Sequence, residues 1–224
     1  MWKQLLGLLR SDNLLKQAWA ECFEMLDVAK VMFDEAVRVL RESDSVEMSA
    51  DVMAMDQKVD AFEQDVRKKV LTHCAVQNAD IPAAMVLVTI VIDLERIGDY
   101  IKNCVKLARE HPERLSGGKY EPELKRLEEA VKKNFVDTRA CLEADDPEMA
   151  SGLLEEFGWV KALCDDVLHG LLSGRDETMS SGQAVALALY FRWLRRINSH
   201  LHNLNTSVAN PFDRIGFKPP VRPA

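Results

Sequence analysis

Residues 81–110 decide the fold class, and they read IPAAMVLVTIVIDLERIGDYIKNCVKLARE. Their apolar side chains recur every three or four positions, which is the period of a helix that packs one face on a core. This stripe consists of Leu87, Ile90, Leu94, Ile97, Ile101 and Ala108. Asp80 can cap the first turn, and Pro82 fits that turn because its missing N–H needs no partner there. The stretch therefore predicts one helix that runs to about Glu110.

Similar spacing on both sides of this stretch predicts five more helices. Neither proline nor glycine occurs between Leu8 and Ile81, which favours long helices over strands. Ser11 and Asp12 are expected to cap the first helix. The expected helices lie at about 13–42, 47–75, 81–110, 122–144, 147–172 and 182–209. The predicted fold class is therefore all-α, a six-helix bundle.

The six helices fall into two related halves. Residues 59–66 (VDAFEQDV) stand 101 positions before residues 160–167 (VKALCDDV), and residues 94–97 (LERI) stand 100 positions before residues 194–197 (LRRI). A repeat of this length is a three-helix unit used twice, and the two units bury a shared face. We expect an N-terminal amphipathic lead at 1–12, a first three-helix repeat at 13–111, a linker at 112–121, a second three-helix repeat at 122–210 and a Pro-rich tail at 211–224.

The composition excludes several classes of protein. The chain has 224 residues, of which 47% are hydrophobic, and a formal net charge of -7. An acidic surface disfavours nucleic acid and anionic membranes, so cationic or protein partners fit better. Five cysteines without a Cys-x-x-Cys pair and without a signal peptide indicate reduced thiols, and hence a cytoplasmic protein. The longest apolar run, residues 81–94, is too short to cross a bilayer.

The lead segment has an apolar face of its own. Trp2, Leu5, Leu6 and Leu9 fall on one side of a helix, which could lie on a membrane surface or dock on the bundle. Docking is the simpler interpretation, because a surface anchor usually carries more Lys and Arg than are present here. Any peripheral membrane association would then go through a partner.

Acidic side chains gather on a second line of the 81–110 helix. That line changes from apolar to acidic along Met85, Val88, Ile92, Glu95 and Asp99. The preceding helix carries Asp56, Asp60 and Glu63. If the two helices are antiparallel about a turn near 79–80, residues equally far from the turn lie at one height. The expected levels are Asp60 with Asp99, Glu63 with Glu95 or Arg96, and Asp56 with Asn103.

This convergence has two interpretations. Oxygen ligands suit Mg²⁺, Ca²⁺, Mn²⁺ or iron, and such a cation would relieve the repulsion between the carboxylates. The alternative is a solvated acidic face crossed by Lys58, Arg96 and Lys102.

Signatures of enzymes are weak in this sequence. There is no Glu-x-x-His pair, Gly-rich phosphate loop, Gly-x-Ser-x-Gly or His-Glu-x-x-His. For His73, His200 and His202 we expect no carboxylate that orients the ring, and hence surface roles. We therefore expect no enzyme. A metal-dependent all-α phosphohydrolase and a purely structural, dimeric scaffold are the alternatives.

Two motifs resemble a known family. Residues 93–103 (DLERIGDYIKN) resemble the signature at the end of the PhoU repeat, in which Glu-Arg-Ile-Gly/Ala-Asp-His precedes a short spacer and Asn. Residues 56–63 resemble the acidic motif on the middle helix of that repeat, and a two-repeat length covers nearly the whole chain. The resemblance implies a cytosolic accessory of phosphate transport that restrains uptake or links the transporter to a phosphate-sensing kinase.

The resemblance also implies a cofactor and partners. Some members hold metal clusters on these motifs, so it implies a divalent metal or iron as cofactor. The implied ligands are Asp56, Asp60, Glu95 and Asp99, with Glu63 a weaker fifth. The implied partner is a phosphate transporter subunit or a phosphate-sensing kinase, and a homodimer is a further expectation.

The second repeat departs from the family pattern. Arg195 and Ser199 stand where Glu and Asp are expected, and Phe157, Lys161 and Cys164 replace the three acids of the middle helix. We therefore expect no metal site in this half. The basic side chains Lys161, Arg195 and Arg196 either hold a phosphate ion or an acidic partner, or they pair with acids such as Asp165 and Asp166. Internal pairing is the simpler of the two.

Overall fold

The helices of the computed structural model occupy nearly all of the residues that it describes, which are 2–43, 51–75, 79–111, 113–174 and 178–217, with side chains from residue 14 on. In chain order they are α1 (Trp2–Val37), α2 (Val52–Cys74), α3 (Ile81–Glu110), α4 (Glu121–Ala144), α5 (Pro147–Glu156), α6 (Val160–Leu172) and α7 (Ser181–Ala209). A π-helical turn, Arg38–Glu42, continues α1, and 3₁₀ turns lie at Gly118–Tyr120 and Phe212–Arg214. These residues include no strand, so the all-α prediction is confirmed.

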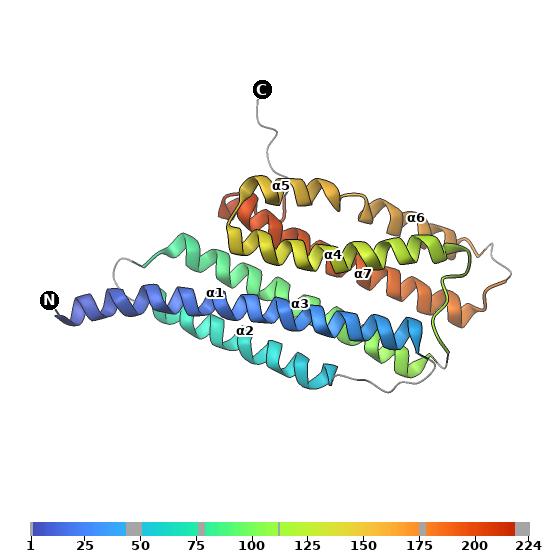
Figure 1. The fold of residues 1–224 in the computed structure, drawn as a ribbon, viewed down its shortest axis with the longest axis horizontal. Coiled ribbons are helices and arrows are strands. Elements are labelled where there is room, and N and C mark those ends of the chain that lie inside the picture. Colours follow the sequence, from blue (N-terminus) through green and yellow to red (C-terminus); the bar gives the residue numbers. More distant parts are fainter. Residues whose placement is uncertain (1, 44–50, 76–78, 112, 175–177, 218–224) are drawn as a thin grey trace, which may run out of the picture.

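Four long helices form the centre of the bundle. In Figure 1, α1, α3, α4 and α7 lie side by side along the long axis, with α2 on one flank and the α5–α6 arm on the other. The pairs α3–α7 and α1–α4 join the first three helices to the last four. No helix within the described ranges is long and apolar enough to cross a membrane.

The predicted start of α3 is confirmed in detail. The Ala83 N–H donates to the Asp80 carboxylate at 3.0 Å, and Pro82 sits in the first turn. Ser180 and Gln183 form a reciprocal capping box at the start of α7. Caps of this kind satisfy backbone N–H groups that have no partner inside the helix.

Two boundary predictions were wrong. The first helix begins at Trp2, with Ser11 and Asp12 inside it, because extending a helix through Leu-rich sequence costs no new nucleation. The helix expected at 147–172 is interrupted between α5 and α6. Phe157 is buried at the break, and Gly158 follows it with backbone carbonyls 3.3 Å from where a Cβ would lie. A glycine that weakens the helix therefore allows the arm to bend around the buried ring.

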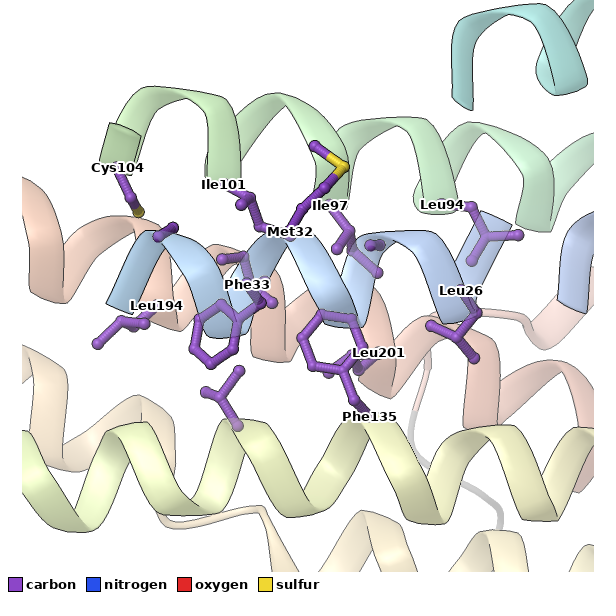
Figure 2. Close-up of a cluster of buried hydrophobic side chains, with 14 of the residues drawn as sticks. Leu26, Met32, Phe33, Leu94, Ile97, Ile101, Cys104, Phe135, Leu194 and Leu201 are labelled. Atoms are coloured by element: carbon purple, nitrogen blue, oxygen red, sulfur yellow. The ribbon is translucent and has the colours of Figure 1, made fainter. Parts of the chain in front are cut away.

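One hydrophobic core runs through both halves. The rings of Phe33 on α1 and Phe135 on α4 lie 5.5 Å apart, and both are almost fully buried. Figure 2 shows Ile97 of α3 and Leu201 of α7 pointing into the same space. The chain thus buries a shared face between its halves, whereas the residue boundaries of the two repeats stay a prediction.

A buried ion-pair network also crosses between the halves. Arg41, at the end of the first helix, donates to Glu128 of α4 at 3.0 Å, to Glu121 at 2.5 Å and to the Leu115 carbonyl. The Tyr190 hydroxyl of α7 donates to the same Glu128 carboxylate at 2.9 Å. Burial raises the pKa of Glu128, against the opposing effects of Arg41 and Tyr190. One cation therefore ties the first helix to α4 and α7.

Candidate functional site

The predicted acidic residues meet along the groove between α2 and α3. Spacings of three and four place Asp56, Asp60 and Glu63 on one side of α2 and place Glu95 and Asp99 on one side of α3. Asp56 is buried, and the other four are partly exposed. We call these five residues the acidic cluster.

Lys102 holds the buried end of the acidic cluster together. Its ammonium lies 2.6 Å from Asp56 Oδ2 on α2 and 2.9 Å from Asp99 Oδ1 on α3. Burial opposes a charge on this ammonium, but the hydrogen bonds to Asp56 and Asp99 outweigh it and raise the pKa of Lys102. Lys102 thus supplies the positive charge that offsets the repulsion between Asp56 and Asp99.

The remaining acids repel one another at the levels that the sequence predicts. Burial and the charges of Asp56 and Asp99 raise the pKa of Asp60, against the effect of Lys102. Burial, Asp99 and Glu63 raise the pKa of Glu95 to about 7, against the effect of Arg96. Asp60 and Asp99 thus lie close enough to affect each other's charge, and so do Glu63 and Glu95.

Two arginines at the rim neutralise part of the remaining charge. Arg96 lies 3.5 Å from Glu95 and 3.4 Å from Asp99, and Arg67 lies 2.7 Å from Glu63. Lys58 pairs instead with Glu24 of α1 at 3.7 Å. With all groups ionised, five carboxylates face Arg67, Arg96 and Lys102, which leaves an excess of two negative charges.

The acidic cluster has donors that suit a hard cation, but its arrangement here is not a coordination site. Among the described residues, no group of three or more His, Cys, Asp and Glu side chains is placed to hold a metal ion. The position between Asp56 and Asp99, where an ion would bridge the helices, holds the Lys102 ammonium. A metal that bound between Asp56 and Asp99 would have to displace this ammonium, and the five-ligand site stays a prediction.

The basic residues of the second half are largely paired within the chain. Lys161 lies 3.0 Å from Asp165, and Arg195 pairs with the same carboxylate. Arg196 reaches across to α3 and donates to the Tyr100 hydroxyl at 3.1 Å. Internal pairing, the simpler of the two predictions, is therefore confirmed for Lys161 and Arg195.

The expectation for His200 was wrong. Its Nδ1 lies 2.6 Å from the Asp93 carboxylate on α3, and the Asn203 amide donates to the same oxygen at 3.0 Å. The ring of Tyr100 stacks on the imidazole with centroids 5.7 Å apart. An aspartate within the apolar run 86–94 was the available signal, because a buried carboxylate needs a partner. The pair fastens α3 to α7.

The surface role expected for His73 was also wrong, because its ring is buried. Its Nε2 accepts a hydrogen bond from the Asp80 N–H at 2.8 Å, so the ring joins the end of α2 to the start of α3. A buried ring at this position fixes the hairpin that sets the register of the acidic cluster.

Comparisons with known proteins agree with this fold. A model of the PhoU domain matches residues 23–108. The structure is similar to PhoU from Pseudomonas aeruginosa, with a TM-score of 0.79 and 17% identity over 88% of this chain and 96% of that chain. It is also similar to the phosphate transport system regulatory protein PhoU from Streptococcus pneumoniae, with a TM-score of 0.77 and 13% identity over 88% and 94% of the two chains. Comparison with curated proteins gives no sequence match. Residues 23–108 thus match the PhoU domain, and the chain as a whole has the fold of these two PhoU structures.

Proposed function

We propose that the chain regulates inorganic phosphate uptake and phosphate signalling from the cytoplasm, by binding a partner rather than by catalysis. The observation that carries this proposal is the PhoU domain match, which includes the whole acidic cluster. The similar protein from Streptococcus pneumoniae is a phosphate transport system regulatory protein. The same role in this chain accounts for the domain and the fold together.

Three groups of buried polar contacts support a function that depends on binding a partner. Lys102 joins α2 to α3, the Asp93–His200 pair joins α3 to α7, and Arg41 joins the first helix to α4 and α7. Each cluster thus fixes the arrangement of helices, and a rigid bundle presents constant outer faces to a partner.

The proposed partner is a phosphate transporter subunit or a phosphate-sensing kinase. To test it, the purified full-length chain is titrated against each purified candidate, with an unrelated transporter as the control, and binding is followed by interferometry. Saturable binding to one candidate and none to the control would support an adaptor. If neither a transporter subunit nor a kinase binds, and phosphate uptake is unchanged without the protein, the proposal is wrong.

We further propose that a divalent metal or iron enters the acidic cluster when Lys102 moves aside. Asp56, Asp60, Glu95 and Asp99 would be the ligands, with Glu63 as a fifth. Lys102→Met should then increase the metal content of protein purified without chelator, and Asp60→Ala/Asp99→Ala should abolish it. Elemental analysis that finds no metal in the wild type and none in Lys102→Met would refute the metal site and leave the regulatory proposal standing.

A further inference from the structure

Beyond the acidic cluster, α2 and α3 carry large exposed apolar side chains. Leu71 near the end of α2 is 73% exposed, and Ile81, Met85 and Ile92 on α3 are 39 to 48% exposed. Large apolar side chains that gather on one exposed face commonly mark an interaction surface. We call these four residues the apolar patch.

Helix geometry places the apolar patch in line with the acidic cluster. On α3, Met85, Val88, Ile92, Glu95 and Asp99 follow one another at spacings of three and four. On α2, Glu63, Arg67 and Leu71 do the same. Lys102 of α3 lies 2.6 Å from Asp56 of α2, and a Cβ at Gly98 would lie 3.6 Å from the same carboxylate, so α2 and α3 pack side by side here. The antiparallel register then puts Leu71 beside the segment between Met85 and Ile92.

The net negative charge of this face favours a positively charged partner. Toward the cluster end the carboxylates exceed the basic side chains by two, and Glu63, Glu95 and Asp99 are all partly exposed. Cationic side chains of a partner would be attracted to these three carboxylates. Nucleic acid and anionic lipid would be repelled instead.

We propose that the α2–α3 face binds an amphipathic helix of a partner protein, with apolar residues against the apolar patch and Lys or Arg against Glu63, Glu95 and Asp99. A third helix fits a groove between two antiparallel helices, because side-chain ridges pack into such grooves. The inference rests on the proposed function, since a regulator that acts by binding needs a docking surface, and it specifies the chemistry of that partner.

A synthetic peptide tests the surface directly. The probe is a helix of about 18 residues, or about 27 Å, with Leu on one face of its first half and Lys on the same face of its second half. A control peptide carries Glu in place of Lys. Fluorescence anisotropy with the full-length chain should show at least tenfold tighter binding of the Lys peptide, and a higher salt concentration should reduce this difference.

Matched variants locate the binding. Leu71→Ser/Met85→Ser should weaken binding of the Lys peptide at least tenfold, whereas Leu172→Ser/Val185→Ser, which removes exposed side chains from α6 and α7, should change it less than twofold. Circular dichroism confirms that both variants are folded. Equal binding by both double variants, equal binding of the two peptides, or no binding of either peptide would overturn the proposal.

The outcome is separable from that of the proposed function. Peptide binding that depends on Leu71 and Met85, in a protein whose removal leaves phosphate uptake unchanged, would retain the surface and refute the regulatory role. If phosphate uptake changes without the protein but the peptide fails to bind, the regulatory role would be retained and the docking surface refuted.

Discussion

Replacement of Arg41 by Met tests the ion-pair network that joins the two halves. The Arg41 side chain is 8% exposed and that of its partner Glu128 is 10% exposed, so the substitution leaves a buried carboxylate that keeps the Tyr190 hydroxyl as a donor but loses its arginine. Methionine keeps much of the length of arginine without its charge. The decrease in the free energy of unfolding therefore reflects the missing positive charge more than a cavity.

The expected cost is large. Removal of one partner from a buried ion pair costs about 3 to 5 kcal/mol, because the remaining charge is left uncompensated. For a chain of this size each kcal/mol lowers Tm by roughly 2 to 4 °C, so Arg41→Met should melt about 6 to 20 °C below the wild type. Arg41→Met/Glu128→Gln removes both charges and should recover most of the loss.

The loss should also depend on pH. Without Arg41, the already raised pKa of Glu128 rises further. A carboxyl whose pKa is higher in the folded state keeps its proton longer there, so stability falls as pH rises from the unfolded value through the folded one. The deficit of Arg41→Met should therefore be larger at pH 8 than at pH 5.

Urea unfolding at pH 5 and pH 8 measures both effects. The control is Lys30→Met, which removes an exposed i,i+4 partner of Asp34 and should cost less than about 1 kcal/mol. If Arg41→Met costs no more than this control, or if the double variant is as unstable as the single one, the network does not stabilise the fold as argued.

Three further substitutions test the acidic cluster and its surroundings, and a fourth tests the contact between α3 and α7. Lys102→Met leaves Asp56 buried without its cation and should cost about 1 to 3 kcal/mol in urea unfolding at pH 7. Glu95→Gln should gain stability over the wild type between pH 5 and pH 8, because the Glu95 pKa of about 7 makes the wild type lose stability as this carboxyl ionises. Gly98→Ala should raise stability by about 0.5 to 1 kcal/mol, since its Cβ would meet Asp56 Oδ1 at an ordinary 3.6 Å. His200→Phe keeps a ring but removes a buried hydrogen bond, and should cost about 1 to 3 kcal/mol in thermal unfolding.

Each of these has a result that contradicts it. For Lys102 that result is unchanged stability at pH 7, and for Glu95 it is a difference from the wild type that stays constant with pH. A destabilised Gly98→Ala would mean that α2 and α3 pack more closely than the structure shows. Wild-type melting of His200→Phe would mean that the Asp93 carboxylate needs no partner at the α3–α7 contact.

Local signals in the sequence accounted for α3 and for the hairpin that it forms with α2. Apolar spacing, Asp80 and Pro82 predicted α3 and its start, and the hairpin register predicted that Asp60 meets Asp99. Both depend on residues close in sequence or joined by one tight turn. The break at Gly158 was missed because one glycine inside a helical pattern also occurs in continuous helices.

Contacts between the halves were not predictable in the same way. Asp93 and His200 are 107 residues apart, and Arg41 and Glu128 are 87 apart, so both pairs depend on how α3, α4 and α7 pack. Lys102 was expected only to cross an acidic surface. Lys102 bridges Asp56 and Asp99 because its side chain is largely buried between α2 and α3. The spacing of residues in the sequence does not predict this burial.

The most direct test of a regulator of phosphate uptake is the initial rate of radiolabelled phosphate uptake in cells that lack the protein. The same cells with the wild-type chain restored, and with equal amounts of transporter confirmed by immunoblot, are the comparison. We expect a changed rate without the protein and its return to normal on restoration. Identical rates in the two strains, at both low and high external phosphate, would contradict the account.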